Sequence, residues 1–508
     1  MKKTLSVIIV CLVIISVGVL LWLRFGINEE HIRHILSDAL GPGYEIELES
    51  ASVYPGSRSI ALSSLLIRHT ESGRTAFEAD TLSISGLSLR TFSGNRLLAS
   101  TFKIDSFILD WPDEASGSSD FQFLSIKTIE ATNGTIIRRE EGQETDRLND
   151  FNLLSTVQYD PPTDADTVAI RDHRIAINSL DFKFFRDRYQ VELRELEYIE
   201  QDSTLTVSSL DLTPIGGFAR FMNSLEYETN MFKIAASNIS ANQIDPVALR
   251  SEDLVSFDHL ELDTFNIHVS QSLKLPENPD EEDPELLNVI VQNLPYALQI
   301  GSILINSSDI QFSQLAEEGV RPGTISFMNS SVHMDNINSE SEKAVTFKTT
   351  TYLENHAELE TELNFTIDDG TFHMSGSGDL APFELKELNS IFMDLEGIEI
   401  MSGVAHELEF EFEMVDDHST GTMHLVYEDL SIQSIDKYDH EKRYQYRFIG
   451  YLFDDLPLRS ENLAENRADL RTGTIDHERA SEDPFFRYLW HTLRSGIYDI
   501  ALRVDISE

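Results

Sequence analysis

The sequence has one cysteine, few basic residues and a single long hydrophobic run. The first two of these features exclude some kinds of site and partner. With Cys11 alone, the chain has no internal disulfide and no thiolate metal site in its body. Its 39 Lys and Arg residues oppose 87 Asp and Glu residues, which gives a net charge of −48. Such a charge repels nucleic acids, so we expect no nucleic-acid partner.

The sequence also lacks the motifs of common catalytic sites. It contains no G-x-S-x-G elbow, no H-E-x-x-H pair, no phosphate-binding loop and no Gly-rich dinucleotide fingerprint. Among 87 acidic residues, carboxylate pairs like those of glycosidases arise by chance. We therefore predict no enzymatic activity, no catalytic residues and no cofactor.

Two segments resemble metal-binding sequences without a full ligand set. His31 and His34 form an H-x-x-H pair, but no further ligands accompany it. The acidic, proline-punctuated segment LPENPDEEDPELL at 275–287 lacks the ligand order of a calcium loop. We interpret this segment as a solvated loop and predict no metal site.

The hydrophobic run is TLSVIIVCLVIISVGVLLWL, from Thr4 to Leu23. At about 1.5 Å per helical residue it matches the hydrocarbon thickness of a bilayer. A cleaved signal peptide is the alternative, but its apolar region would be shorter and would end in small residues. We therefore predict a transmembrane anchor at 1–27 with a cytoplasmic N-terminus and an extracytoplasmic body. The anchor residues are Leu5, Val7, Ile8, Ile9, Leu12, Ile14, Val17, Leu20 and Trp22.

Amphipathic helices are predicted near both ends of the chain. The segment 28–43 has apolar residues at helical spacing and ends in Gly41-Pro42. In the C-terminal segment 451–508, the sequence after Glu482 has one apolar helical face. Its members are Phe485, Leu489, Leu493, Ile497 and Ile500. This helix either lies on a membrane surface or caps a sheet, and we favour the cap.

Between these segments the sequence predicts strands. A six-residue unit, apolar–x–small polar–apolar–x–apolar, recurs as IDSFIL (104–109), FDHLEL (257–262), IGSILI (300–305) and others. Its first and fourth positions would face opposite sides of a flat strand. Each copy therefore predicts a bend or bulge near the polar residue, or a strand that is buried on both faces.

The cleanest alternation of apolar and acidic residues lies in the C-terminal third, for example HELEFEFEM at 406–414. Strands of this kind have one apolar and one anionic face. We predict two parts of one curled β-sheet, 44–274 and 288–450, with the acidic loop 275–287 between them.

Several of these segments resemble the AsmA-like family of envelope proteins, which includes TamB-type members. The resemblance rests on GPGYEIELESASVYP after the first helix, GDLAPFELKELNSIFMDLEGIEIMSG (378–403), GTMHLVYEDLSI (421–432) and RTGTIDHERASEDPFFRYLWHTLRSGI (471–497). It implies a mainly β fold, with a long, curled, largely antiparallel sheet as a groove. The residues that would line this groove for lipid are Leu359, Leu363, Phe365, Ile367, Phe372, Met374, Leu408, Phe410, Phe412, Met414, Met423 and Leu425. It also implies a protein of the bacterial inner membrane whose periplasmic body carries phospholipid acyl chains in outer-membrane lipid homeostasis, with a partner in the outer membrane or envelope.

The residues alone leave a second function open. A closed sandwich would use the same alternation, and burial stabilises an apolar side chain equally well against Leu or an acyl chain. A non-catalytic periplasmic scaffold of β-sandwich domains is therefore the alternative to a lipid-binding groove.

Overall fold

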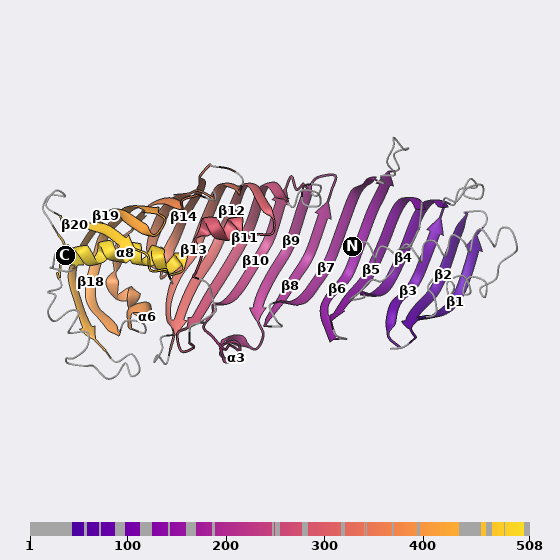
Figure 1. Cartoon of the computed structure of the whole chain (residues 1–508), viewed down its shortest axis with the longest axis horizontal. Coiled ribbons are helices and arrows are strands. Elements are labelled where there is room, and N and C mark those ends of the chain that lie inside the picture. Colours follow the sequence, from indigo (N-terminus) through magenta and orange to yellow (C-terminus); the bar gives the residue numbers. More distant parts are fainter. Residues whose placement is uncertain are drawn as a thin grey trace. The chain divides into compact units, whose positions relative to one another are not determined.

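The computed structural model shows a chain made mainly of strands, with few helices (Figure 1). None of the helices within the described residues combines the length and hydropathy needed to cross a bilayer. The predicted anchor at 1–27 lies outside these residues, as does the helix predicted at 28–43 except for Gly43. The structure describes residues 43–54, 58–70, 73–86, 97–111, 124–140, 143–158, 169–184, 188–245, 248, 254–276, 283–315, 321–339, 341, 343–367, 370–393, 397–435, 459–463, 470–481 and 483–501.

The described strands belong to one 20-stranded sheet, which is mostly antiparallel and curls without closing on itself. This confirms the predicted fold class at the level of a curled, mainly antiparallel sheet. The chain divides into two compact units, Met1–Leu210 and Asp211–Glu508. The described residues of the predicted acidic loop 275–287 belong to the second unit.

The first unit contains the strands up to β9, within which the boundary falls. From β1 to β8, neighbouring strands in the sequence pair with each other, antiparallel except for the parallel pair β4–β5. The strands are β1 (Tyr44–Tyr54), β2 (Ser59–His69), β3 (Thr75–Ser85), β4 (Leu97–Trp111), β5 (Leu124–Glu140), β6 (Gln143–Gln158), β7 (Ala169–Phe184), β8 (Tyr189–Ile199) and β9 (Thr204–Pro214).

The second unit contains the remaining strands and the described helices. Its strand pairs are antiparallel except for β11–β12. The elements are α3 (Gly217–Asn223), β10 (Met231–Asn242), β11 (Leu254–Ser272), α5 (Leu287–Gln292), β12 (Ala297–Leu315), β13 (Gly323–Asn338), β14 (Val345–Leu353), β15 (Ala357–Phe365), β16 (His373–Leu380), β17 (Phe383–Glu384), η2 (Leu385–Leu388), α6 (Asn389–Ile391), β18 (Ile398–Val415), β19 (His418–Ser434), β20 (Thr472–Glu478) and α8 (Phe485–Ala501).

A line of polar residues with a left-handed backbone crosses the strands of the first unit, and we call it the crease. Its residues with positive φ are Ser64, Ser106, Asn133, Asp150 and Glu195, with φ between 49° and 53°. Each lies where the regular pairing of the strands skips a residue. The predicted bend is thus confirmed in IDSFIL at Ser106.

The crease keeps apolar residues on one face although their spacing changes along the strand. In β4, Ile104, Phe107 and Leu109 are all buried and belong to one apolar cluster. The step of three from Ile104 to Phe107 would reverse the face in a flat strand. Because Ser106 adopts a left-handed conformation, one residue is added to the strand and Phe107 returns to the apolar face.

The second unit has a crease of its own, with hydrogen bonds between the polar side chains. In β10, Asn238 has a φ of 48°, and its Nδ2 donates to Asp263 Oδ2 of β11 at 2.8 Å. Asn306 Nδ2 of β12 donates to Asp263 Oδ1 at 3.3 Å. Further along, the backbone N–H of Asn329 donates to Asp309 Oδ1 at 3.0 Å. These bonds satisfy polar groups at the positions where the regular ladder is interrupted.

The opposite face of the second unit carries rows of acidic side chains. Glu360 of β15 pairs with Asp379 of β16, which in turn pairs with Glu409 of β18. The acidic residues of HELEFEFEM therefore do lie on the face away from the apolar residues. Basic groups lie among them, as where Lys348 Nζ is 3.0 Å from Glu362 Oε2. We call this the acidic face.

We expect backbone conformation at the crease to decide how substitutions act there. Ser106→Val should destabilise the protein by about 1–2 kcal/mol, because a branched side chain is strained at a positive φ. Ser106→Gly should be neutral or stabilising. Urea unfolding of both variants measures the difference.

The matched control for this prediction is Thr101→Val, which places the same residue in the same strand away from the crease. It should change the free energy of unfolding by less than about 0.5 kcal/mol. Equal destabilisation by Ser106→Val and Thr101→Val would contradict a strained crease.

Candidate functional site: the apolar face of the second unit

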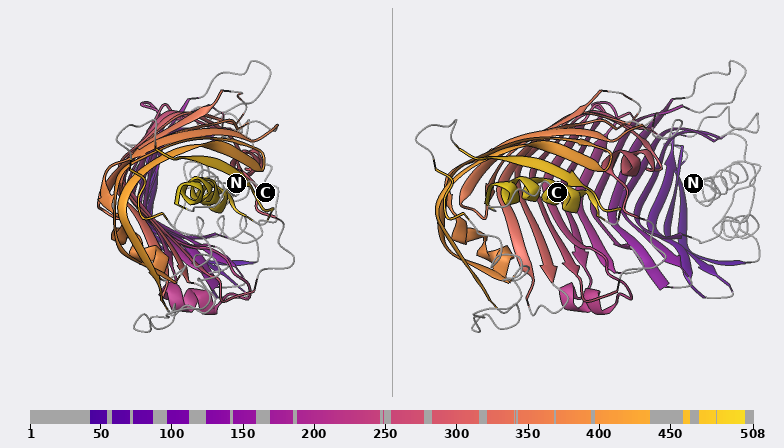
Figure 2. Two further views of the ribbon diagram at one scale, coloured as in Figure 1. Left: turned by 90° about the vertical axis from the view of Figure 1, so that its left-hand side faces the viewer. Right: turned by 60° about the vertical axis from the view of Figure 1, so that its left-hand side comes forward.

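The strands of the second unit curve around helix α8, which lies against their apolar face (Figure 2). Phe485, Tyr488 and Ile500 of α8 are buried in one cluster with residues of β16, β18, β19 and β20. Leu489, Leu493 and Ile497 pack against the same cluster. The predicted apolar face of the C-terminal helix is therefore confirmed, and it covers the sheet.

The predicted lipid-lining residues lie largely in this cluster under α8. Phe410, Phe412 and Met414 of β18 are 7%, 4% and 0% exposed. Ile367 instead belongs to a smaller cluster that Val291 of α5 helps to form. The other members of the α8 cluster from the predicted set are Leu359, Leu363, Phe365, Phe372, Met374, Leu408, Met423 and Leu425. At this end the apolar face is filled by the protein itself, and lipid binding to these residues stays a prediction.

Close packing holds α8 on the sheet. Gly473 of β20 lies against Gly496 of α8, and a Cβ at Gly473 would lie 2.4 Å from the Gly496 carbonyl oxygen. Polar contacts flank this approach, since Arg471 Nη2 donates to Asp499 Oδ1 at 3.0 Å. The backbone N–H of Thr474 donates to Asp499 Oδ2 at 2.8 Å. The glycine contact and the Asp499 bonds together fix the position of the helix.

The same apolar face continues across the sheet beyond α8. Residues that are direct partners on neighbouring strands point to the same side. Starting from Phe412 under α8, the register leads through Gly376 and Leu363 to Phe347. From there it passes to β13, β12, β11 and β10. The partners on these strands are Met334, Ile303, Leu260 and Ala241.

Two further rows lie on this side of the sheet and are less buried. One row is Phe327, Ile310, Ile267 and Ile234, and the other is Ile325, Phe312, Val269 and Phe232. They share the face for the following reason. Leu353 is six residues from Phe347 in the regular strand β14, so both side chains point to the same side, and Leu353 pairs with Phe327. We call these eight residues the open face.

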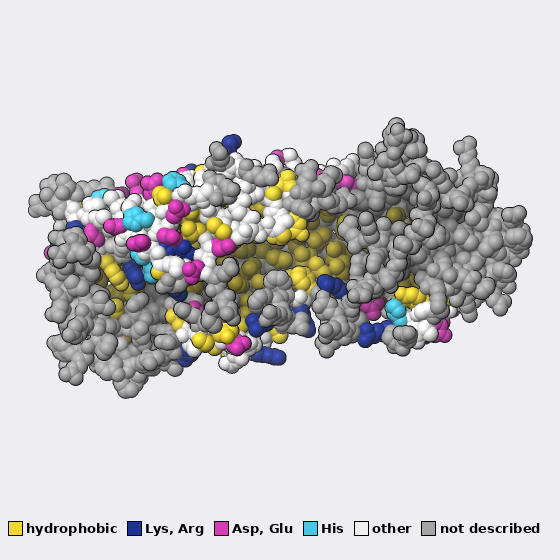
Figure 3. Space-filling view, viewed as in Figure 1, with side chains coloured by type: hydrophobic (Ala, Val, Ile, Leu, Met, Phe, Trp, Pro, Cys, Tyr) yellow, Lys and Arg dark blue, Asp and Glu magenta, His cyan; other side chains and the backbone are white. Residues whose placement is uncertain are grey.

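The open face differs from the covered end in its exposure. Phe232 is 37% exposed, and the other seven side chains are partly exposed. Figure 3 shows a hollow lined by hydrophobic side chains in the middle of the view, which includes the region where Figure 1 has strands β10–β12. None of the eight residues is charged. Water therefore reaches apolar side chains here, whereas α8 excludes it from the equivalent side chains of β18.

Among the residues that the structure describes, one group of side chains could hold a metal ion. It consists of His477, Asp483 and His491, which lie beside α8 and not on the open face. The sequence reasoning missed this group because its members come from separate elements. The open face contains no titratable side chain, so it has no chemistry beyond apolar contact.

Comparison with known proteins finds no match, either to a protein-family model, to a curated protein or to a solved structure. The function must therefore be inferred from the residues of this chain.

Sequence reasoning placed the candidate site at the strands with the cleanest alternation, and the open face lies elsewhere. Phe257 to Leu262 and Ile300 to Ile305, in two copies of the six-residue unit, lie on the strands of the open face. The sequence shows the copies of the unit, but it does not show that side chains on these strands are partly exposed to water. Exposure depends on where α8 packs, and no local pattern gives that contact.

We expect two identical substitutions on this face to differ in cost. Phe412→Ala should destabilise the lipid-free protein by about 3–5 kcal/mol, because it leaves a cavity under α8. Phe312→Ala on the open face should cost roughly 1 kcal/mol, because its side chain is already partly hydrated. Urea unfolding measures both values, and equal costs would show that the open face is sealed.

Proposed function

We propose that the protein binds lipid acyl chains on the open face. The observation that carries this proposal is a set of partly exposed apolar side chains, in register across β10–β13, on the concave side of the sheet. Contiguous apolar surface of this kind marks interaction sites in proteins, because leaving it in water is unfavourable. An acyl chain is a ligand that such a surface can bind through contact alone.

The energetics favour a hydrocarbon ligand over a polar one. Burying a methylene group contributes about 0.8 kcal/mol, so eight methylenes on the open face would contribute roughly 6 kcal/mol. A charged headgroup would lose hydration there, and no residue of the open face could compensate. The tail would therefore lie on the strands while the headgroup stays in water.

The wider setting of this function is part of the proposal. The hydrophobic run at 4–23 would anchor the chain in the bacterial inner membrane, and the body would act in the periplasm in outer-membrane lipid homeostasis, as in the AsmA-like proteins that the sequence resembles. The strong negative charge of the acidic face would keep that face in water, away from anionic lipid surfaces. No catalytic step is needed for this role.

A non-catalytic scaffold remains the competing function. It was expected to consist of stacked β-sandwich domains, whereas the described strands belong to one sheet. The filled end under α8 is compatible with a scaffold, since that part needs no ligand. The open face separates the two functions, because a scaffold has no use for exposed apolar rows.

The purified full-length protein should carry phospholipid, which native mass spectrometry and lipid extraction detect. Ile310→Glu should reduce the bound lipid at least tenfold, because a carboxylate on the open face would have to be desolvated under an acyl chain. The fold should persist, since Ile310 is partly exposed.

The control is Leu304→Glu, which introduces the same charge in the same strand on the acidic face. Leu304 pairs with Glu261 and His333, so its side chain points away from the open face. This variant should keep the wild-type lipid content. A folded, lipid-free wild-type protein, or equal lipid loss in both variants, would exclude the proposed function in favour of a scaffold.

A further inference from the structure

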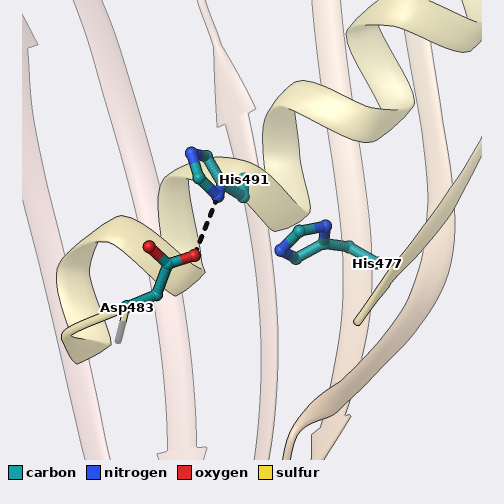
Figure 4. A group of neighbouring side chains, drawn as sticks. All are labelled: His477, Asp483 and His491. Carbon is teal, nitrogen blue, oxygen red and sulfur yellow. Dashed lines mark ion pairs between the residues drawn. The ribbon is translucent and has the colours of Figure 1, made fainter. Parts of the chain in front are cut away.

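Three potential metal ligands meet where α8 begins beside the last strand (Figure 4). His477 comes from β20, Asp483 precedes α8, and His491 lies in its second turn. Their nearest nitrogen and oxygen atoms all lie within 4.8 Å of one another. The three residues are polar and lie on or next to β20 and α8, whereas the open face lies on β10–β13, so lipid binding does not use them.

The distances suit a small tetrahedral ion. Around Zn²⁺, nitrogen and oxygen ligands about 2.0–2.1 Å from the metal lie roughly 3.4 Å from each other. His491 Nδ1 lies 3.2 Å from Asp483 Oδ2, close to that separation. His477 completes the triangle from the neighbouring strand, and Figure 4 shows its ring directed towards the other two side chains.

A second observation, separate from the distances, concerns a ring nitrogen of His477. The Nε2 atom of His477 is buried and has no hydrogen-bond partner among the described residues. A buried polar atom without a partner is unfavourable, because it has given up its hydrogen bonds to water without replacing them. A metal ion between the three side chains would accept the lone pair of this nitrogen.

The surroundings prepare these groups to act as ligands. Burial lowers the pKa of His477, although the charge of Asp483 opposes that effect. Burial, and then the positive charge of Arg494, lower the pKa of His491. Both shifts favour the neutral imidazole, which is the form that binds metals. Arg494, Asp476 and His418 are the other charged or titratable groups that act on His477.

Asp483 is held in place by groups that leave one of its oxygens for the ion. It is only 5% exposed, and Arg487 Nη1 lies 3.4 Å from its Oδ1. Arg479 Nε donates to the backbone carbonyl of Asp483 at 2.8 Å. Oδ2 remains directed at His491, as the dashed line in Figure 4 shows.

We propose that His477, Asp483 and His491 bind one Zn²⁺ ion that joins β20 to the start of α8. Two imidazoles and one carboxylate favour zinc over Mg²⁺ or Ca²⁺, which prefer oxygen ligands. A water molecule would complete the coordination. Since the ligands come from both elements, the ion acts as a clasp that keeps α8 on the sheet.

The test uses the full-length protein stripped with a chelator and then titrated with ZnCl₂ alone. We expect saturable binding of one equivalent by calorimetry, and an increase of several degrees in Tm on zinc addition. Co²⁺ in place of zinc should give the visible absorption of a tetrahedral site with nitrogen and oxygen ligands. The absence of saturable binding in the wild-type protein would overturn the proposal.

Two variants locate the ion. His477→Gln should weaken zinc binding at least tenfold and abolish the zinc-dependent Tm increase. His418→Gln is the matched control, because His418 is exposed beside Asp476 and would contribute only non-specific binding. The assignment would be contradicted if both variants lost zinc binding equally, or if neither variant lost it. The Co²⁺ spectrum of the wild-type protein decides the question if His477→Gln does not fold.

Discussion

The structure depends on one constraint, namely that each strand has a single apolar face which must be kept from water. The crease makes this possible along the whole strand, because a left-handed residue such as Ser106 or Asn238 restores the apolar face after an odd step in the sequence. Strand after strand places this residue at matching positions in the register. A sheet built in this way has a continuous apolar side, and its curvature brings that side inwards.

The second unit covers this side in two ways. Helix α8 shields the strands β16 and β18–β20 with its own apolar face, so that the interior there resembles an ordinary protein core. On β10–β13 the apolar side chains are only partly covered. The same face therefore changes from a closed core to an accessible surface within one unit. A lipid on the open face would replace the contacts that α8 makes at the other end.

The sequence was informative where a pattern is local. HELEFEFEM identified β18 and its two faces, and the spacing of Phe485 to Ile500 identified α8. The polar position of IDSFIL marked the crease at Ser106. The contact between α8 and β20 was not predictable, because it depends on two glycines, Gly473 and Gly496, that approach each other in space. Because the position of α8 could not be predicted, the lining residues were predicted on the strands that α8 covers.

The acidic face has a mechanical consequence for a sheet of this kind. Glu360, Asp379 and Glu409 lie side by side on neighbouring strands, so their negative charges repel one another. Curling towards the apolar side spreads the outer carboxylates apart while it crowds the inner hydrocarbon groups together. Electrostatic repulsion outside and hydrophobic attraction inside thus bend the strands in the same direction. Salt screens the repulsion between the carboxylates but does not weaken the hydrophobic attraction. The curvature of the sheet should therefore decrease as the ionic strength rises.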